Sequence, residues 1–479
     1  MTEFSLRMSD GTHIVLPPSL SAITTYVLLE QEQWFEKETQ FLARWLKRGM
    51  NVIDIGANLG VYSLPAARMA GPTGQVYAYE PASETRRMLE AGKRKNRSIN
   101  LNVIAAALSD SERDGKLFLG TSSELNTLEG SGDGEAIRIS SLDAEQAARN
   151  WGRIDFLKID AEGEELRILD GAKSFFASQS PLVMFEVKAG ERINEELRAA
   201  FVALGFRLYR QLGGAAILVP VAPDAALDGY EINLFAIRPE QAAELAKDGL
   251  LADAIADWTP DEVARAKALD LIKTQAFAPT FAQLIGAPLD ETYREALAGY
   301  AVWRGAEGSL SERVGALRFA CDKLQALCDT LPSLARLSTL ARVSSDFGCR
   351  SVSANALQSL TGMLKDGTGR MEEAFWPASA RFDKIAPGAH VMEWFVVSAL
   401  EQFERTAFFS STFGNSGVDL DWLVRQPFVS AEMERRRILK YAQAGRTMDV
   451  PKRLMTSGPD HINSDKWRAG QVPNTVAKR

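Results

Sequence analysis

Cysteine and histidine are scarce in this chain, which has three of each among its 479 residues. The three cysteines, Cys321, Cys328 and Cys349, have neither metal-finger spacing nor a histidine nearby. We therefore expect Cys321 and Cys328, which share an apolar-periodic segment, to be buried thiols rather than redox or metal-binding residues. His13 is the only histidine before residue 390. A histidine general base is thus poorly supported.

Long apolar runs and an excess of positive charge are also absent. No stretch of 18 apolar residues occurs, and residues 1–5 do not form a basic region followed by an apolar core, so we expect neither a membrane span nor secretion. The 55 Lys and Arg against 62 Asp and Glu give a net charge of −7, which offers no general attraction for nucleic acid or anionic membranes. These features predict a soluble, cytoplasmic protein, and its length predicts two or three domains.

The most informative segment is Asp54-Ile55-Gly56-Ala57-Asn58-Leu59-Gly60. It follows the apolar run 50–53 and precedes the apolar-periodic stretch 61–69, an order that predicts strand, glycine loop and helix. A second strand pattern, 74–79, ends at Glu80, about 20 residues beyond the loop. At that spacing a doubly wound sheet places an acid against a ribose. An adenosine-containing cofactor is therefore expected.

The type of cofactor follows from what the loop lacks. A dinucleotide site has three glycines spaced G-x-G-x-x-G, whereas only Gly56 and Gly60 are present, with Asn58 between them. No Gly-Lys-Ser/Thr follows to hold a triphosphate. S-adenosylmethionine (SAM) fits better, with Asp54 facing its ammonium and Glu80 its ribose hydroxyls. The alternative is that the two glycines serve only as turn residues.

At this point the chain resembles a known family, the FkbM-type SAM-dependent methyltransferases. Five motifs appear in the family's order: Asn51 to Gly60, Val76 to Pro81, Ala105 to Asp110, Ser141 to Asp143, and Asp155 to Gly163. The resemblance covers residues 30 to 240 and implies a class I methyltransferase fold, SAM as cofactor and O-methylation of hydroxyls on sugars or secondary metabolites. It also implies that Ser109 and Asp110 hold the adenine amine. Ala161 departs from the valine usual in the family.

Candidate catalytic residues lie at the ends of predicted strands. Further strands are expected at 101–106, 154–159 and 182–186 with helices between them, and shorter ones at 206–209, 216–219 and 232–237 as an antiparallel edge. Ligands in such sheets bind beyond the carboxyl ends of the strands. With Asp54 and Glu80 assigned to the cofactor, Asp160, Glu162 and Glu186 are left to face the substrate.

A carboxylate there can act as general base on an acceptor hydroxyl. Asp160 is the first candidate, although Lys158 on the same face would weaken it as a base, and Glu162 is the second. Either acid can instead cap the helix that starts near Glu164. A divalent cation on Asp160 and Glu162 is a further alternative, but no third oxygen ligand is identifiable by spacing and no metal site is assigned. The polar loop 120–134 is expected to cover the substrate, with Ser122, Ser123 and Asn126 as hydrogen-bond donors. The alternative is that this loop is an ordinary insertion.

The fold class expected is α/β: a Rossmann-like methyltransferase domain with a mostly parallel sheet and an antiparallel edge, followed by an all-α domain. A helix is expected at 32–46, and the segment 334–367 faintly resembles a tetratricopeptide repeat, with a plain helical bundle as the alternative. The domains expected are a β-rich lead-in (1–29), the methyltransferase domain (30–240), a helical linker (241–289), the helical domain (290–445) and a basic, partly disordered tail (446–479).

The function expected is SAM-dependent O-methylation of a hydroxyl on a sugar or glycan. The alternatives are a catalytically inactive SAM-fold scaffold that binds a protein partner through its helical half, and an N-methyltransferase. A homo-oligomer formed through the helical half is a further expectation, whereas nucleic acid is not expected as a partner.

Overall fold

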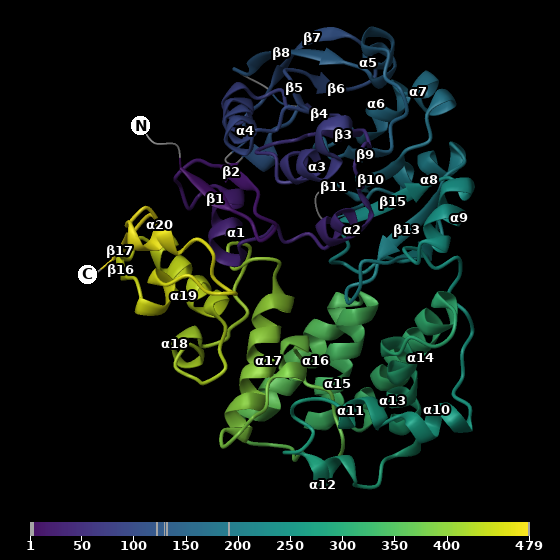
Figure 1. The fold of residues 1–479 in the computed structure, drawn as a ribbon, viewed down its shortest axis with the longest axis vertical. Coiled ribbons are helices and arrows are strands. Elements are labelled where there is room, and N and C mark those ends of the chain that lie inside the picture. The colour runs from purple at the N-terminus through teal and green to yellow at the C-terminus, as the bar shows by residue number, and fades with distance from the viewer. Residues whose placement is uncertain (1–3, 121–122, 129, 131–132, 190–191, 478–479) are drawn as a thin grey trace.

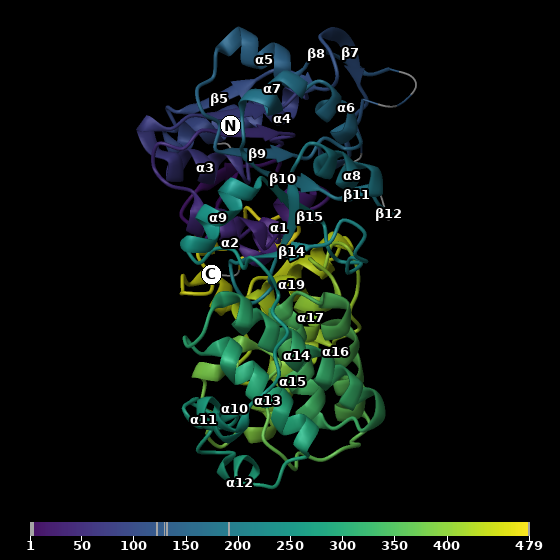
Figure 2. The same ribbon diagram turned by 90° about the vertical axis from the view of Figure 1, so that its right-hand side faces the viewer.

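The structure is a computed structural model that describes residues 4–120, 123–128, 130, 133–189 and 192–477. Figures 1 and 2 show an elongated molecule with an α/β part at one end and a bundle of helices at the other. The last part of the chain, drawn in yellow, returns to lie beside the purple N-terminal segment (Figure 1). Among the described residues, no helix has both the length and the apolar character needed to cross a membrane.

An eight-stranded sheet with the order β14-β13-β15-β10-β9-β3-β4-β5 forms the centre of the α/β part. The strands from β10 to β5 are parallel, whereas β15, β13 and β14 form an antiparallel edge. This confirms the predicted mostly parallel sheet with an antiparallel edge. The strands are β3 (Val52–Ile55), β4 (Val76–Tyr79), β5 (Leu101–Ile104), β9 (Phe156–Ile159), β10 (Leu182–Glu186), β13 (Arg207–Gln211), β14 (Leu218–Val221) and β15 (Asn233–Ile237).

Both faces of the sheet are covered, which explains why its strands read as nearly continuous apolar runs. Residues of opposite faces, such as Val52 and Ile53, belong to two separate buried apolar clusters. Strands β4 and β5 lie on one side of β3, whereas β9 lies on its other side. The strand order therefore reverses between β3 and β9. The covering helices are α3 (Ser63–Ala70), α4 (Ser83–Asn96), α5 (Leu142–Arg149), α6 (Glu165–Asp170), α7 (Lys173–Ser178), α8 (Glu195–Ala203) and α9 (Pro239–Lys247).

The N-terminal segment differs from its prediction. The hairpin β1 (Ser5–Arg7) and β2 (His13–Val15) is followed by helix α1 (Ile23–Gln31), which crosses the domain boundary expected at residue 29. The helix expected at 32–46 is formed only as α2 (Glu38–Trp45). Glu32 ends α1 with a left-handed φ of 59°, and the carboxylate of Glu32 accepts hydrogen bonds from the backbone of Ile462 and Asn463. A contact with the far end of the chain thus sets this break.

An additional three-stranded sheet is formed by residues that lie between β5 and β9 in the sequence. It consists of β6 (Ala107–Leu108), β7 (Arg113–Leu117) and β8 (Glu135–Ser140). The polar loop predicted at 120–134 connects β7 to β8 and includes the short 3-10 helix η2 (Ser123–Leu125). Ser122, one of the expected hydrogen donors, lies outside the described residues. Two further strands, β11 (Lys188–Ala189) and β12 (Arg192–Ile193), form a small hairpin after β10.

The helical half is built from hairpins whose helices pack side by side. The segment expected as a helix pair, 334–367, forms α15 (Leu334–Phe347) and α16 (Arg350–Lys365), with Gly348 at φ 86° in the turn between them. A common apolar cluster joins the helices of this half to one another. The other helices are α10 (Glu262–Lys267), α11 (Asp270–Lys273), α12 (Ala282–Ile285), α13 (Glu291–Arg304), α14 (Leu310–Thr330) and α17 (Val391–Ala407).

The C-terminal segment corrects the expectation of a partly disordered tail. After α18 (Leu420–Leu423) and α19 (Ala431–Gln443), strands β16 (Met448–Asp449) and β17 (Thr475–Val476) pair, and between them lie η4 (Lys452–Met455) and α20 (Ser464–Arg468). Trp467 is fully buried in the apolar cluster that also contains residues of α1. The basic composition misled here, because a few apolar side chains are enough to fix the segment.

A buried polar network strengthens this return contact. The fully buried carboxylate of Glu30 on α1 accepts hydrogen bonds from the Ser410 hydroxyl and from the Ser411 backbone, at 2.5 and 3.0 Å. Arg436 on α19 lies 3.6 Å from both Glu30 and Glu404. The N-terminal helix, α17 and α19 are therefore held together by charges that water does not reach.

Candidate functional site

Four acids lie at the carboxyl ends of neighbouring strands, as the sequence predicted. Asp54 is near the end of β3, Glu80 directly follows β4, Asp160 follows β9 and Glu186 ends β10. A pocket with an empty volume of about 950 Å³, part of it open to solvent, lies beside this edge at the point where the strand order reverses. The predicted site residues that line it are Asp54, Gly56, Asn58, Glu80, Asp160 and Glu162.

Two glycines shape the loop after β3. Gly56 has a φ of 76°, and a Cβ atom there would lie 1.8 Å from the backbone oxygen of Asp160. Gly60 has a φ of 86°, and its Cβ would lie 2.5 Å from Leu89 on α4. Both positions therefore require glycine. Gly60, which does not line the pocket, acts by letting the loop pack against α4 rather than by touching a ligand.

Asp54 has the geometry expected of a residue that binds a cationic group. One carboxylate oxygen, Oδ2, accepts a hydrogen bond from the Ser63 hydroxyl at 2.5 Å. The other, Oδ1, is buried and has no hydrogen-bond partner among the described residues. Burial raises the pKa of Asp54, because a charged group is costly where water cannot reach it. The Lys158 ammonium lies 3.9 Å from this oxygen, too far for a hydrogen bond, so an ammonium group of the cofactor could still donate to it.

Glu80 is held in place by the backbone. Its two carboxylate oxygens accept hydrogen bonds from the amides of Asn58, at 2.9 Å, and Ala82, at 2.8 Å. Burial raises the pKa of Glu80 to about 7. Each carboxylate oxygen keeps a lone pair, so the side chain can still accept hydrogen bonds from ribose hydroxyls. The residues present therefore fit both ends of SAM.

Ser109 and Asp110 are not brought to the pocket. The buried Ser109 hydroxyl donates a hydrogen bond to Glu164 at 2.6 Å, and the exposed Asp110 carboxylate pairs with Arg113. The chain turns away after β6, which carries Asp110 to the surface of the additional sheet. Apolar side chains of Ala106, Ala107, Leu108 and Leu117 line this side of the pocket instead. Ser109 thus lies next to the pocket through Glu164, which lines it, and the adenine role of Ser109 and Asp110 stays a prediction.

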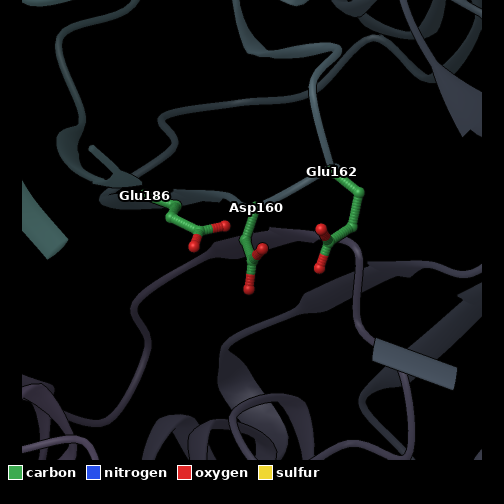
Figure 3. A group of neighbouring side chains, drawn as sticks. All are labelled: Asp160, Glu162 and Glu186. Carbon is green, nitrogen blue, oxygen red and sulfur yellow. The ribbon is translucent and has the colours of Figure 1, made fainter. Parts of the chain in front are cut away.

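Asp160, Glu162 and Glu186 form a cluster of carboxylates. Oxygens of all three lie within 4.8 Å of one another, and Figure 3 shows the side chains in a row. Burial, together with the charges of Asp160 and Glu162, raises the pKa of Glu186, so that this residue keeps its proton. The Glu162 side chain is exposed to solvent; partial loss of its hydration, followed by the charges of Asp160 and Glu165, raises its pKa to about 7. The cluster thus combines a proton donor with an acid that titrates near neutrality.

Lys158 neutralises part of this negative charge. Its ammonium lies 2.7 Å from Asp160 and 3.9 Å from Asp54, and the residue is buried. Burial alone would lower the pKa of Lys158, but the charges of Asp160, Asp54 and Glu36 raise it. Lys158 therefore stays protonated and links the cofactor end of the site to the acid cluster.

The three carboxylates also supply the oxygen donors that a hard divalent cation prefers. Glu186 would be the third oxygen ligand of such a cation; spacing along the sequence did not reveal it, because it lies on the neighbouring strand. Lys158 already donates to Asp160, however, so a cation would compete with an internal ammonium.

Sequence reasoning did not identify Glu36 or the contact that holds the β7–β8 loop. Glu36 lines the pocket and accepts hydrogen bonds from the Trp34 indole at 2.9 Å, the Tyr62 hydroxyl at 2.5 Å and the Asn233 amide at 2.9 Å. Burial raises the pKa of Glu36. Its position in the Trp34-Phe35-Glu36 run was the available signal, since an acid among aromatics is rarely placed for packing alone.

The β7–β8 loop closes one side of the pocket. Ser123 and Asn126, both expected as hydrogen-bond donors, line the pocket together with Glu124. Glu124 accepts hydrogen bonds from the backbone amide and the hydroxyl of Thr24 at the start of α1. The N-terminal helix therefore anchors the loop next to the cofactor pocket.

Part of the chain is similar to known protein families and structures. Residues 54–208 match the profile of the Methyltransferase FkbM domain. An FkbM methyltransferase structure from Methylobacillus flagellatus KT is 16% identical, with 39% of this chain and 43% of that chain covered and a TM-score of 0.28. The match therefore spans less than half of that protein.

Two further structures are similar at the same level. A SAM-dependent O-methyltransferase from Thermotoga maritima is 18% identical, with 49% and 77% of the two chains covered and a TM-score of 0.26. Aeropyrum pernix fibrillarin, solved with natively bound SAM, is 14% identical, with 49% and 83% covered and a TM-score of 0.25. No curated protein matches the chain. The match to the Methyltransferase FkbM domain thus spans residues 54–208, the part of the chain that carries the glycine loop and the four strand-end acids.

Proposed function

We propose that this protein transfers the methyl group of SAM to a hydroxyl oxygen, most specifically of a sugar or glycan. The observation that carries the proposal is the position of the acid cluster. Asp160 and Glu162 line the same pocket as Asp54 and Glu80, so an acceptor oxygen placed beside the cluster is also beside the cofactor. A hydroxyl needs such a base, since it is a weak nucleophile until its proton leaves.

The bound cofactor supplies a methyl group already activated on a sulfonium. The chain then has to place the acceptor oxygen and remove its proton. Positioning alone contributes about 7–11 kcal/mol when the reacting atoms are held in a near-attack arrangement. Asp54 and Glu80 fix one end of the pocket, and the β7–β8 loop limits access of water from one side.

The geometry changes the order of the two candidate bases. Lys158 donates to Asp160 at 2.7 Å, so one oxygen of that carboxylate is already engaged by an internal ammonium. Among the described residues no ammonium is bonded to Glu162, and its pKa of about 7 matches the task of a base at neutral pH. We therefore assign Glu162 as general base, with Asp160 and Lys158 positioning the acceptor hydroxyl.

Two alternatives make different predictions. An N-methyltransferase would need no base for a neutral amine, so replacing Glu162 would leave its rate nearly unchanged. A scaffold would bind a protein partner without methyl transfer. A cluster that combines one protonated acid and one acid titrating near pH 7 supports the O-methyltransferase over both.

The proposal also covers the type of acceptor and the cellular location of the protein. The net charge of −7 disfavours a polyanionic acceptor such as nucleic acid. We propose a cytoplasmic enzyme in which the helical half either contributes to acceptor binding or forms a homo-oligomer.

The experiment that tests the proposal has two steps. Calorimetry with SAM and with its demethylated product first measures cofactor binding. Incubation with methyl-labelled SAM and cellular glycan, lipid and protein fractions then shows which fraction gains label. Label in the glycan fraction, lost in Glu162→Gln, is the expected result. Binding without label in any fraction would favour the scaffold.

A further inference from the structure

A second pocket lies where the methyltransferase domain meets the helical half. Its empty volume is about 870 Å³, part of it open to solvent. Residues of the segment 35–38 and of the edge-strand region form one side, and Gly348, Arg350, Gln402 and Thr406 from the helical half form the other. Small-molecule sites are often found at such domain interfaces.

The two pockets share one residue. Glu36 lines both, and its carboxylate is bonded to Tyr62 on the side of the first pocket. The charges of Lys158 and Asp160 act on the Glu36 carboxyl, which places it close to the acid cluster. The Glu36 side chain therefore lies at the boundary between the two pockets.

Most charged groups that line the second pocket are already paired. Lys37 and Glu231 form an ion pair at 2.8 Å, and Asp228 accepts hydrogen bonds from the backbone and hydroxyl of Ser351. Arg405 is bonded to Glu432 at 2.9 Å. These paired side chains form part of the pocket wall and have little hydrogen-bonding capacity left for a ligand.

Glu38 is the exception on the acidic side. The residue is 3% exposed, and among the described residues its carboxyl accepts a hydrogen bond only from its own backbone amide. Burial raises the pKa of Glu38 to about 8. At neutral pH the group is largely protonated and can both donate and accept a hydrogen bond. The carboxyl therefore keeps hydrogen-bonding capacity that a ligand in the pocket can use.

Arg350 is the counterpart from the helical half. Its Nε and Nη2 atoms donate to the carbonyl oxygens of Thr406 and Arg405 at 2.9 and 2.8 Å. Its Nη1 donates to no residue that the structure describes. The guanidinium stacks over Phe409 at 4.2 Å and Tyr230 at 5.2 Å, which fixes its plane in the pocket wall. The same pocket is thus lined by an Arg350 guanidinium with unused donors and by a Glu38 carboxyl with unused hydrogen-bonding capacity.

We propose, building on the proposed function, that this second pocket binds the body of the acceptor, a neutral polyhydroxylated ring, while the reacting hydroxyl reaches past Glu36 to the acid cluster. Hydroxyl groups are donors and acceptors at once and satisfy both Glu38 and Arg350. A simple cation would face Arg350 and a simple anion would leave Glu38 unpaired. Phe35, Tyr230 and Phe409 supply apolar surface for the carbon face of a ring.

The test measures binding of defined probes without relying on turnover. The full chain is first given an excess of S-adenosylhomocysteine, so that its cofactor site is occupied. Saturation-transfer NMR is then recorded with the methyl pyranosides of glucose, mannose and rhamnose as probes. We expect a signal from at least one glycoside. Glu38→Met should weaken its binding about tenfold or more, whereas Glu38→Gln, which keeps a donor and an acceptor, should retain it. Glu38→Met removes a buried ionisable group, so the variant should fold.

The matched control is Glu434→Met. Burial also raises the pKa of Glu434, but this residue of α19 lines neither pocket. Its replacement should leave glycoside binding unchanged. If S-adenosylhomocysteine binds but no glycoside gives a signal, or if Glu38→Met binds as well as the wild type, the second pocket is not the acceptor site. Failure to bind the cofactor product at all would instead overturn the proposed function.

Discussion

A Cβ atom on Gly56 would lie 1.8 Å from the carbonyl oxygen of Asp160. The loop after β3 and the end of β9 are thus in direct backbone contact, and the cofactor end and the acid end of the site are fixed to each other. No movement of a flexible side chain can relieve a clash with a carbonyl oxygen.

Gly56→Ala should therefore abolish cofactor binding. The substitution adds the clash to the strain of a φ of 76°, so the loop and β9 must separate. Calorimetry with SAM should show a loss of affinity of at least about 100-fold, equivalent to about 2.7 kcal/mol. Gly229→Ala is the control, since a Cβ there meets nothing within 4 Å. Normal SAM affinity in Gly56→Ala would contradict the placement of the pocket.

Lys158→Met should destabilise the fold strongly. It leaves Asp54, Asp160 and Glu36 without their shared ammonium, and removal of one partner from a buried ionic group costs about 3–5 kcal/mol. Urea unfolding measures the loss, with the exposed Lys173→Met as control. The deficit should shrink as the pH falls, because protonation of the carboxyls removes the uncompensated charge. A deficit independent of pH would point to lost packing instead.

The pH dependence of methyl transfer should follow Glu162. A base must be unprotonated, so kcat/KM should rise with pH below about 7, the pKa of Glu162, and level off above it. Glu162→Gln should remove this limb and lower kcat/KM by about 10²- to 10⁴-fold. Asp160→Asn serves as the comparison. If Asp160→Asn abolishes the limb while Glu162→Gln keeps it, Asp160 is the base.

Removal of divalent cations should leave methyl transfer unchanged. Lys158 already neutralises Asp160, and Glu186 holds a proton, so the cluster has less negative charge than three free carboxylates. Turnover measured with EDTA and with added Mg²⁺ should agree. A loss with EDTA that Mg²⁺ restores would show that the three acids bind a cation.

The residues that could be placed from sequence are those whose position depends on local pattern. The order of strand, glycine loop and acid located Asp54, Gly56 and Glu80, since each follows directly from its position in a βαβ unit. The same logic placed Asp160 and Glu186 at strand ends. The sheet and its antiparallel edge followed from the alternation of apolar runs with helical segments.

The residues that were missed depend on contacts between distant parts of the chain. Glu32 ends α1 because its carboxylate binds the backbone near residue 462, and this break frees Glu36 and Glu38 to line the two pockets. Asp110 was assigned to adenine by its place in a motif, but the additional sheet carries it to the surface. Neither outcome is encoded in a local pattern.

The packing of α19 and Trp467 onto α1 has a consequence for biosynthesis. Helix α1 is synthesised before the segment that covers it, so a nascent chain emerging from the ribosome exposes the apolar side chains of α1 until α19 and Trp467 have been made. Parallel strands and helices downstream of α1 can assemble meanwhile. Chaperone contact with the nascent N-terminal helix should accordingly persist until residues beyond 467 have left the exit tunnel.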